Sequence, residues 1–220
     1  MSITIVAVSD FHGNLPKKII PPCDILVIAG DMCPARHTPD SWALQAAWLD
    51  SKFRKWLEDQ PAKHIVGCGG NHDWIFQHTR LAVPKGLKWT YLQDSFTEIE
   101  GVKIYGTPWT NPFLDWAFNA TEEEQKELFG KIPDGIDILM SHGPPHGILD
   151  VAKDLHSDDM LHVGSRTLKQ RVFAVKPKLH LFGHIHSGHG LVEHDGITFA
   201  NVSVLDEDYK MVYPPQVFHI

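Results

Sequence analysis

Short apolar runs recur along the chain and predict buried β-strands. The first covers residues 3–10 (ITIVAVSD) and is apolar almost throughout, as expected of a strand covered on both faces. Comparable runs predict further strands at 24–31, 63–71, 136–143 and 178–184. Each run ends at a short turn that contains glycine, so the pattern marks the strand ends clearly.

Helical periodicity is clearest between the second and third of these strands. Thr38 is a suitable N-cap, and Pro39 would occupy the first helical position. Apolar residues then recur at spacings of four and three residues, at Trp42, Ala46, Leu49, Phe53 and Trp56. This stripe predicts an amphipathic helix that buries all of these side chains in the core.

Two further helices are expected later in the chain. Thr121 and Glu124 form a capping box that opens a short helix, and Gly130 closes it. Residues 165–175 predict another helix, because the pattern stops just before Pro177.

The remaining pattern is typical of antiparallel strands. Residues 97–109 predict a hairpin that turns near Glu100–Gly101, and residues 190–204 and 211–220 predict late antiparallel strands. Strand–helix units followed by hairpins predict an α/β fold, with a two-sheet β-sandwich core flanked by helices. Since no linker or repeat interrupts the pattern, we expect 1–220 to form a single domain without a separate cap domain.

Composition excludes several classes of protein. The net charge is −7 and no long basic run occurs, so no strong nucleic-acid footprint is expected. No apolar run has the roughly 18 residues of a membrane span. The N-terminus, MSITIVAVSD, lacks a basic n-region and a cleavage site, so we expect no signal peptide and a cytoplasmic protein. Three widely spaced cysteines argue against disulfides and a cysteine-based zinc site.

Side chains that can bind metal ions follow the predicted strands. They are Asp10, His12, Asp31, Asn71, His72, Asp73, His142, His184 and His186. Ligands in α/β folds bind at the carboxyl ends of strands, and the neighbouring glycines allow sharp turns and close approach. The sequence therefore predicts one site built from five strand ends.

The character of these side chains indicates the metal. They offer oxygen and imidazole nitrogen but no sulfur, which suits Mn, Fe, Zn or Ni. They are too numerous for one metal that keeps open positions, and they suit two metals that share a carboxylate. Two metals roughly 3.5–4 Å apart are the usual device for cleaving phosphoesters.

In their order along the chain, the motifs D-x-H, G-D, G-N-H-D, H-G and G-H-x-H resemble the signature of calcineurin-like metallophosphoesterases. The resemblance covers residues 3 to about 204 and implies the αββα fold of that family. The stretches 142–150, 166–190 and 201–204 further resemble the group of metallophosphoesterase-domain-containing phosphodiesterases. Some members of that group have glycine in place of His184, so its presence here implies a complete dinuclear centre.

The resemblance also implies a role for each motif residue. Those implied for the first metal are Asp10, His12 and His186. Those implied for the second metal are Asn71, His142 and His184. Asp31 would bridge the two metals. His72 would act as a catalytic residue facing the leaving-group oxygen, and Asp73 would hold the other nitrogen of its ring.

The implied activity is that of a dinuclear metal-dependent phosphodiesterase. It would hydrolyse small phosphoester substrates, such as cyclic nucleotides, through a metal-activated hydroxide. The implied cofactors are two divalent transition metal ions, Mn²⁺ in the first place and Fe, Zn or Ni otherwise. Phosphomonoesterase, protein phosphatase, nuclease and non-catalytic scaffold stay open as alternatives, and so does the oligomeric state. Retention of His72 and of every ligand argues against the scaffold.

Several other residues are candidates for the surroundings of the site. His37 could face the substrate, whereas His146 and His189 are expected at the rim or surface. Trp109, Asn111, Trp116 and Asn119 could line a pocket wall, although core packing is favoured for most of them. Cys33 and Cys68 are expected to pack near the metals without binding them.

Overall fold

A computed structural model describes residues 2–16, 20–34, 42–154 and 157–220. The predicted cap at Thr38, Pro39 and the candidate His37 lie outside these ranges. In the described parts of the chain, no helix is both long and apolar enough to cross a membrane.

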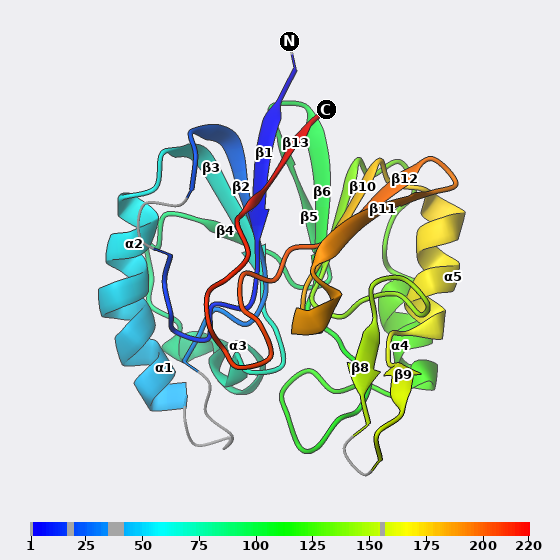
Figure 1. Cartoon of the computed structure of the whole chain (residues 1–220). Coiled ribbons are helices and arrows are strands. Elements are labelled where there is room, and N and C mark those ends of the chain that lie inside the picture. The colour runs from blue at the N-terminus through cyan, green and yellow to red at the C-terminus, as the bar shows by residue number, and fades with distance from the viewer. Residues whose placement is uncertain (1, 17–19, 35–41, 155–156) are drawn as a thin grey trace.

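Two large sheets form the centre of the fold (Figure 1). The first sheet has the order β13-β1-β2-β3-β4. Its strands are β1 (Thr4–Val8), β2 (Cys23–Ala29), β3 (Ala62–Cys68), β4 (Thr90–Tyr91) and β13 (Gln216–His219). β1 to β4 are parallel, whereas β13 runs antiparallel to β1.

The second sheet has the order β11-β12-β10-β7-β6-β5. Its strands are β5 (Ser95–Ile99), β6 (Val102–Thr107), β7 (Ile138–Ser141), β10 (Leu179–Phe182), β11 (Gly190–His194) and β12 (Ile197–Asn201). A separate two-stranded hairpin joins β8 (Val151–Lys153) and β9 (Met160–His162). The predicted sandwich of two sheets is confirmed.

Alternating side chains of the strands fill the space between the sheets, because successive residues of a strand face opposite sides. Ile5 and Val27 of the first sheet belong to one buried cluster with Ile138 and Leu181 of the second. The helices cover the outer faces (Figure 1). Those on the first sheet are α1 (Trp42–Trp48), a π-helical turn (Leu49–Phe53), α2 (Arg54–Glu58) and α3 (Trp74–His78). Those on the second are α4 (Glu122–Phe129) and α5 (Arg166–Val175). Short 3₁₀ turns occur at Arg80–Ala82 and His186–Gly188.

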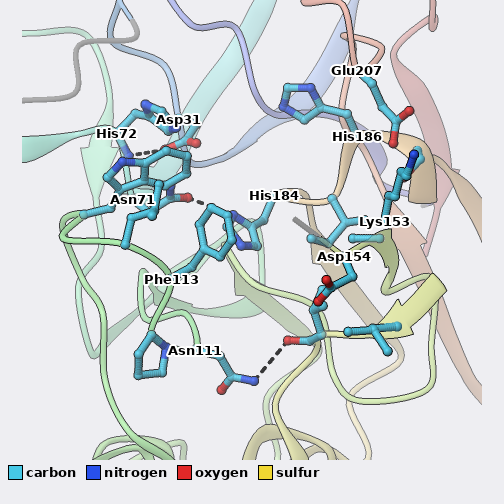
Figure 2. Close-up of a pocket in the computed structure, with 18 of the residues that line it drawn as sticks. Asp31, Asn71, His72, Asn111, Phe113, Lys153, Asp154, His184, His186 and Glu207 are labelled. Atoms are coloured by element: carbon cyan, nitrogen blue, oxygen red, sulfur yellow. Dashed lines mark hydrogen bonds between the residues drawn. The ribbon is translucent and has the colours of Figure 1, made fainter. Parts of the chain in front are cut away.

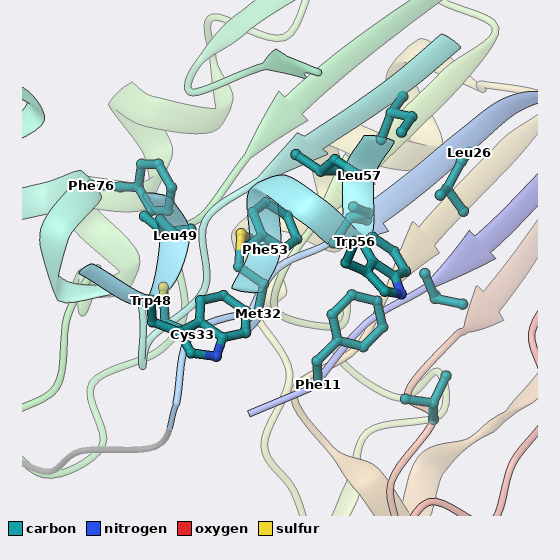
Figure 3. Close-up of a cluster of buried hydrophobic side chains, with 14 of the residues drawn as sticks. Phe11, Leu26, Met32, Cys33, Trp48, Leu49, Phe53, Trp56, Leu57 and Phe76 are labelled. Atoms are coloured by element: carbon teal, nitrogen blue, oxygen red, sulfur yellow. The ribbon is translucent and has the colours of Figure 1, made fainter. Parts of the chain in front are cut away.

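The predicted apolar stripe of the first helix is buried except at its N-terminal end. Leu49, Phe53 and Trp56 pack into the core against the first sheet (Figure 3). The prediction for Trp42 is wrong, because its side chain is 39% exposed. Trp42 is the first residue of α1, and this end of the helix extends past the ends of the strands (Figure 1), where no sheet covers it.

Local sequence signals are reproduced closely. β5 and β6 form the predicted hairpin, with Glu100 and Gly101 at positive φ as a two-residue turn requires. Thr121 and Glu124 form the predicted reciprocal capping box at the start of α4. The antiparallel pairs β11–β12 and β1–β13 confirm the late strands.

Candidate metal centre

The structure brings all of the predicted metal ligands together between the two sheets. They lie in the loops that follow β1, β2 and β3 of the first sheet and β7 and β10 of the second. The parallel strands direct these loops to the same end of the fold (Figure 1). A cavity of about 730 Å³ opens beside them, within the usual size of a small-molecule site (Figure 2).

Asp10, His12 and His186 form one half of the cluster. Nε2 of His186 lies 3.6 Å from Oδ1 of Asp10 and 3.3 Å from Nε2 of His12. The Asp10 carboxylate also accepts the backbone N–H of His184, at 3.1 and 3.2 Å to its two oxygens. This bond ties the end of β1 to the end of β10, which positions the ligands of both loops.

Asn71, His142 and His184 form the other half. The side-chain oxygen of Asn71 lies 2.8 Å from Nε2 of His142 and 2.8 Å from Nδ1 of His184. Asp31 lies between the two halves, with Oδ2 at 3.6 Å from Nε2 of His12 and 3.3 Å from Nε2 of His142. This is the arrangement expected of a bridging carboxylate.

Hydrogen bonds on the far side of two imidazole rings fix where their lone pairs point. Nδ1 of His142 lies 2.9 Å from the carbonyl oxygen of Ala29, and Nδ1 of His186 lies 2.9 Å from that of Asp206. Carbonyl oxygens only accept, so each Nδ1 carries a hydrogen, and each Nε2 is the nitrogen that faces the cluster and can bind a metal once it is deprotonated. Divalent cations bind where several lone pairs and carboxylates face one another. In known metal sites, the second nitrogen of a ligating imidazole commonly donates to a carbonyl or carboxylate oxygen, as it does here. The residues present therefore fit the two implied metals.

The pKa values are consistent with this donor set. Burial disfavours the charged form of Asp10, yet the hydrogen bond and charge of His186 lower its pKa to about 2. Burial lowers the pKa of His12 and of His184 to about 3, so both rings are neutral. Burial opposes protonation of His142 as well, but the Asp31 carboxylate raises its pKa to about 9. Metal binding at His142 therefore releases a proton.

Four of the ligands have strained backbone conformations. The φ angles are 58° at Asp10, 44° at His12, 53° at Asp31 and 69° at His184, all in the left-handed region that side chains disfavour. Such strain persists only where the surrounding structure enforces it, and it concentrates at functional sites.

The neighbouring glycines allow the close approach that the sequence predicted. A Cβ atom on Gly183 would clash with the Asp10 carboxylate, and one on Gly70 would clash with Asp31. A Cβ atom on Gly30 would clash with the His142 ring. These positions have no room for a side chain because the ligands themselves occupy it.

His72 lies beside the ligand cluster and is buried. Its ring centroid is 4.6 Å from that of His12 and 4.2 Å from that of Trp116. The His72 backbone N–H donates to Oδ1 of Asp31 over 2.8 Å, and its carbonyl accepts from Nε2 of Gln45 over 2.6 Å. A nitrogen of the His72 ring lies within 4.8 Å of ligand atoms of His12 and Asp31, so the ring borders the two ligand sets described above.

Asp73 forms different bonds from those predicted. Its carboxylate accepts the backbone N–H of Cys33 over 2.9 Å and that of Gly70 over 2.8 Å. These bonds join the loops after β2 and β3. The carboxylate of Asp73 thus holds the loop backbone, and its predicted role in orienting the ring of His72 stays a prediction. Cys33 and Cys68 are both fully buried.

The other candidates separate into two groups. Asn111 and Trp116 line the cavity, as predicted for some members of their stretch. Trp109 instead donates to Asp94 over 2.9 Å, and Asn119 donates to backbone carbonyls within its own loop. His189 stacks on Tyr213 with ring centroids 4.2 Å apart, which is a packing contact.

His146 and His189 are not among the described residues that line the cavity. The backbone N–H of His146 donates to Ser165 over 2.9 Å, and Nδ1 of His189 bonds to the carbonyl of Ser203 over 2.8 Å. Neither residue therefore belongs to the ligand cluster.

Sequence reasoning missed Tyr209, which also lines the cavity. Its ring centroid lies 4.9 Å from that of His12 and 5.3 Å from that of His186. The same loop supplies the Asp206 carbonyl that fixes the His186 ring. No motif marks this loop, so only the folded chain reveals its part in the site.

Comparison with known proteins agrees with this arrangement. The model of the calcineurin-like phosphoesterase family matches residues 3–188. Human metallophosphoesterase domain-containing protein 1 is 32% identical, over 98% of this chain and 70% of the human protein. The Caenorhabditis elegans UPF0046 protein C25E10.12 is 29% identical, over 99% of this chain and 81% of that protein. The solved structure of TT1561 from Thermus thermophilus has the same fold, with a TM-score of 0.56 at 15% identity over 99% of each chain. Because the family match spans all five strand ends that carry the ligands, this chain belongs to the calcineurin-like phosphoesterase family.

Proposed function

We propose that this chain is a dinuclear metal-dependent phosphodiesterase that hydrolyses small phosphodiesters, cyclic nucleotides among them. The observation that carries the proposal is the convergence of two ligand sets on Asp31. Asp10, His12 and His186 would hold one ion. Asn71, His142 and His184 would hold the other. When bound, the ions supply a nucleophile at neutral pH and neutralise charge on the phosphoryl oxygens.

The chain's own residues would do the rest. His72 would protonate the leaving oxygen, because its ring lies beside His12 at the edge of the ligand cluster. Gln45 holds the backbone of His72, which fixes where this ring stands. The cavity would hold the groups that the phosphate esterifies.

The charge of the cavity supports a diester over a monoester. Among the described residues that line it, Lys153 is the sole lysine or arginine, and Nζ of Lys153 lies 2.7 Å from Asp158. Asp154 and Glu207 add negative charge. A monoester carries about two negative charges near neutral pH, whereas a diester carries one, so this lining favours the less charged ester.

The test is hydrolysis of bis(p-nitrophenyl) phosphate, cyclic AMP and p-nitrophenyl phosphate by metal-stripped protein reloaded with Mn²⁺, Fe²⁺, Zn²⁺ or Ni²⁺. We expect metal-dependent turnover with a higher kcat/KM for the diesters than for the monoester. Absence of turnover with all four metals would refute the proposal that the chain is an enzyme. A higher kcat/KM for the monoester would refute the diester preference.

A further inference from the structure

Several large apolar side chains that line the cavity are exposed to solvent. Phe113 is 38% exposed, Leu114 is 65% exposed and Leu161 is 44% exposed, and all three line it. We call Phe113, Leu114, Trp116 and Leu161 the apolar slot. Exposed apolar side chains gathered at a concave surface are typical of ligand contacts.

The loop that carries most of the apolar slot is held in place by specific bonds. Leu114 has a φ of 52°, which a bulky side chain disfavours. Nδ2 of Asn119 donates to the carbonyl of Phe113 over 3.2 Å and to that of Leu114 over 3.0 Å, and these bonds stabilise the strained turn. The chain thus maintains an unfavourable backbone that presents apolar side chains to the cavity.

The two walls of the cavity are also fastened to each other. Nδ2 of Asn111 donates to the carbonyl of Val163 over 3.0 Å, next to the end of β9 (Figure 2). Leu161 belongs to β9, so this bond sets its wall relative to the wall that carries Phe113. The apolar slot is therefore a built feature of the fold.

The apolar slot begins at His72. The Trp116 ring centroid lies 4.2 Å from that of His72 and 5.3 Å from that of Phe113. A group that leaves phosphorus on the side of His72 would therefore enter the apolar slot directly. Since Lys153 is paired with Asp158, the cavity offers little to attract a further negative charge on that group.

We propose that the apolar slot binds the leaving group of the substrate, and that this group is an uncharged planar alcohol such as a phenol. This inference rests on the proposed phosphodiesterase function. In the reaction, a water oxygen bonds to phosphorus while the bond from phosphorus to the leaving oxygen breaks. His72 gives its proton to the leaving oxygen, the attacking water loses one proton to solvent, and His72 is protonated again from solvent. For such an acyclic diester the products are a phosphomonoester and the alcohol, whereas a cyclic nucleotide would open to a single phosphomonoester.

Two substrates distinguish the leaving group from the group that stays on phosphorus. Both bis(p-nitrophenyl) phosphate and methyl p-nitrophenyl phosphate release p-nitrophenolate, but only the first retains an aryl group. Phe113→Ala and Leu161→Ala are expected to lower kcat/KM about tenfold for both substrates. Phe113→Tyr keeps the ring and should stay within about twofold of wild type. Leu191→Ala, on β11 and 52% exposed, is the matched control outside the cavity.

Each outcome decides between defined alternatives. A loss confined to bis(p-nitrophenyl) phosphate would place the retained group in the apolar slot and overturn the proposal. Unchanged kcat/KM in both alanine variants would overturn the proposal as well. The proposed phosphodiesterase function would still stand in that case, because the wild type turns over the substrates. If metal-loaded wild type hydrolyses neither substrate, the proposed function itself fails. Thermal melts and metal content of each variant check that the fold and the metal centre are preserved.

Discussion

The side-chain oxygen of Asn71 lies 2.8 Å from Nε2 of His142, although the hydrogen of that ring is held at Nδ1 by the Ala29 carbonyl. Two lone pairs therefore face each other inside the protein. Such a contact is stable only if a cation or an additional proton lies between the two atoms. The Asp31 carboxylate raises the pKa of His142 to about 9 against the effect of burial, which favours a proton on this ring when metal is absent.

Metal loading should consequently stabilise the fold. At a free Mn²⁺ concentration of about 100 times Kd, each bound ion adds about 2.7 kcal/mol to the free energy of unfolding, and one ion alone sets the lower limit of the shift. For a chain of this length we expect Tm to rise by roughly 5–10 °C. Differential scanning calorimetry of metal-stripped and reloaded protein measures this shift. His184→Ala should bind less metal and show a smaller shift in Tm. His194 is exposed, so His194→Ala should behave as wild type. Equal shifts in wild type and both variants would contradict the assignment of His184 as a metal ligand.

His72→Ala should retain both metals and lose turnover. The His72 ring lies 4.6 Å from that of His12 but is not among the residues predicted to bind either metal, so both predicted ligand sets stay intact without it. We expect kcat to fall by ~10²–10⁴-fold for substrates with a poor leaving group. The loss should be smaller with p-nitrophenolate, which leaves without a proton. Metal analysis of the purified variant checks the assignment, and dissociation of both metals would show that it is wrong.

Gln45→Leu should weaken both the fold and the catalytic site. Nε2 of Gln45 donates to the carbonyl of His72 over 2.6 Å, and its Oε1 accepts the N–H of Ile75 over 3.0 Å. All of these atoms are buried, so leucine would leave two backbone groups without partners at a cost of about 2–4 kcal/mol. Urea unfolding measures this loss, and kcat should fall while metal content stays constant. Gln60→Leu removes a less buried bond, to the Trp56 carbonyl, and should cost under about 1 kcal/mol.

The stabilisation that the Glu122 carboxylate contributes should be lost in acid. Burial raises the pKa of this carboxyl, but hydrogen bonds from Thr167, Arg166 and Ser165 outweigh burial and lower it below 4.5. A lowered pKa means that the stabilisation is present above the unfolded value and is lost as pH falls through the folded value. Because the side chain is only partly buried, Glu122→Gln should cost only about 0.5–1 kcal/mol at pH 7.

The difference between wild type and Glu122→Gln should shrink as pH falls through the lowered folded pKa of Glu122, because the carboxyl is then protonated. Urea unfolding at pH 7 and pH 3 measures it. Glu123→Gln, on the same turn of α4 but exposed, is the control. A difference that persisted unchanged in acid would mean that the charge of Glu122 contributes nothing.

The sequence by itself determined most strands of the two large sheets, the capping box of α4 and the β5–β6 hairpin, and it placed the candidate metal ligands at strand ends. These features depend on periodicity and on neighbours within a few residues, such as Thr121 with Glu124 or Glu100 with Gly101. Parallel strands end at the same edge of a sheet, so residues placed at strand ends had to meet.

Only the tertiary structure decided which groups complete the site. Asp73 bonds to backbone amides of two loops and Tyr209 covers His12, because the loops after β2 and β3 and the loop at 205–211 meet in space. The apolar slot likewise joins the loop of Phe113 to β9. Trp42 is exposed because its turn of helix passes beyond the sheet. Such contacts join residues far apart in the chain, and no local pattern specifies the path of a loop.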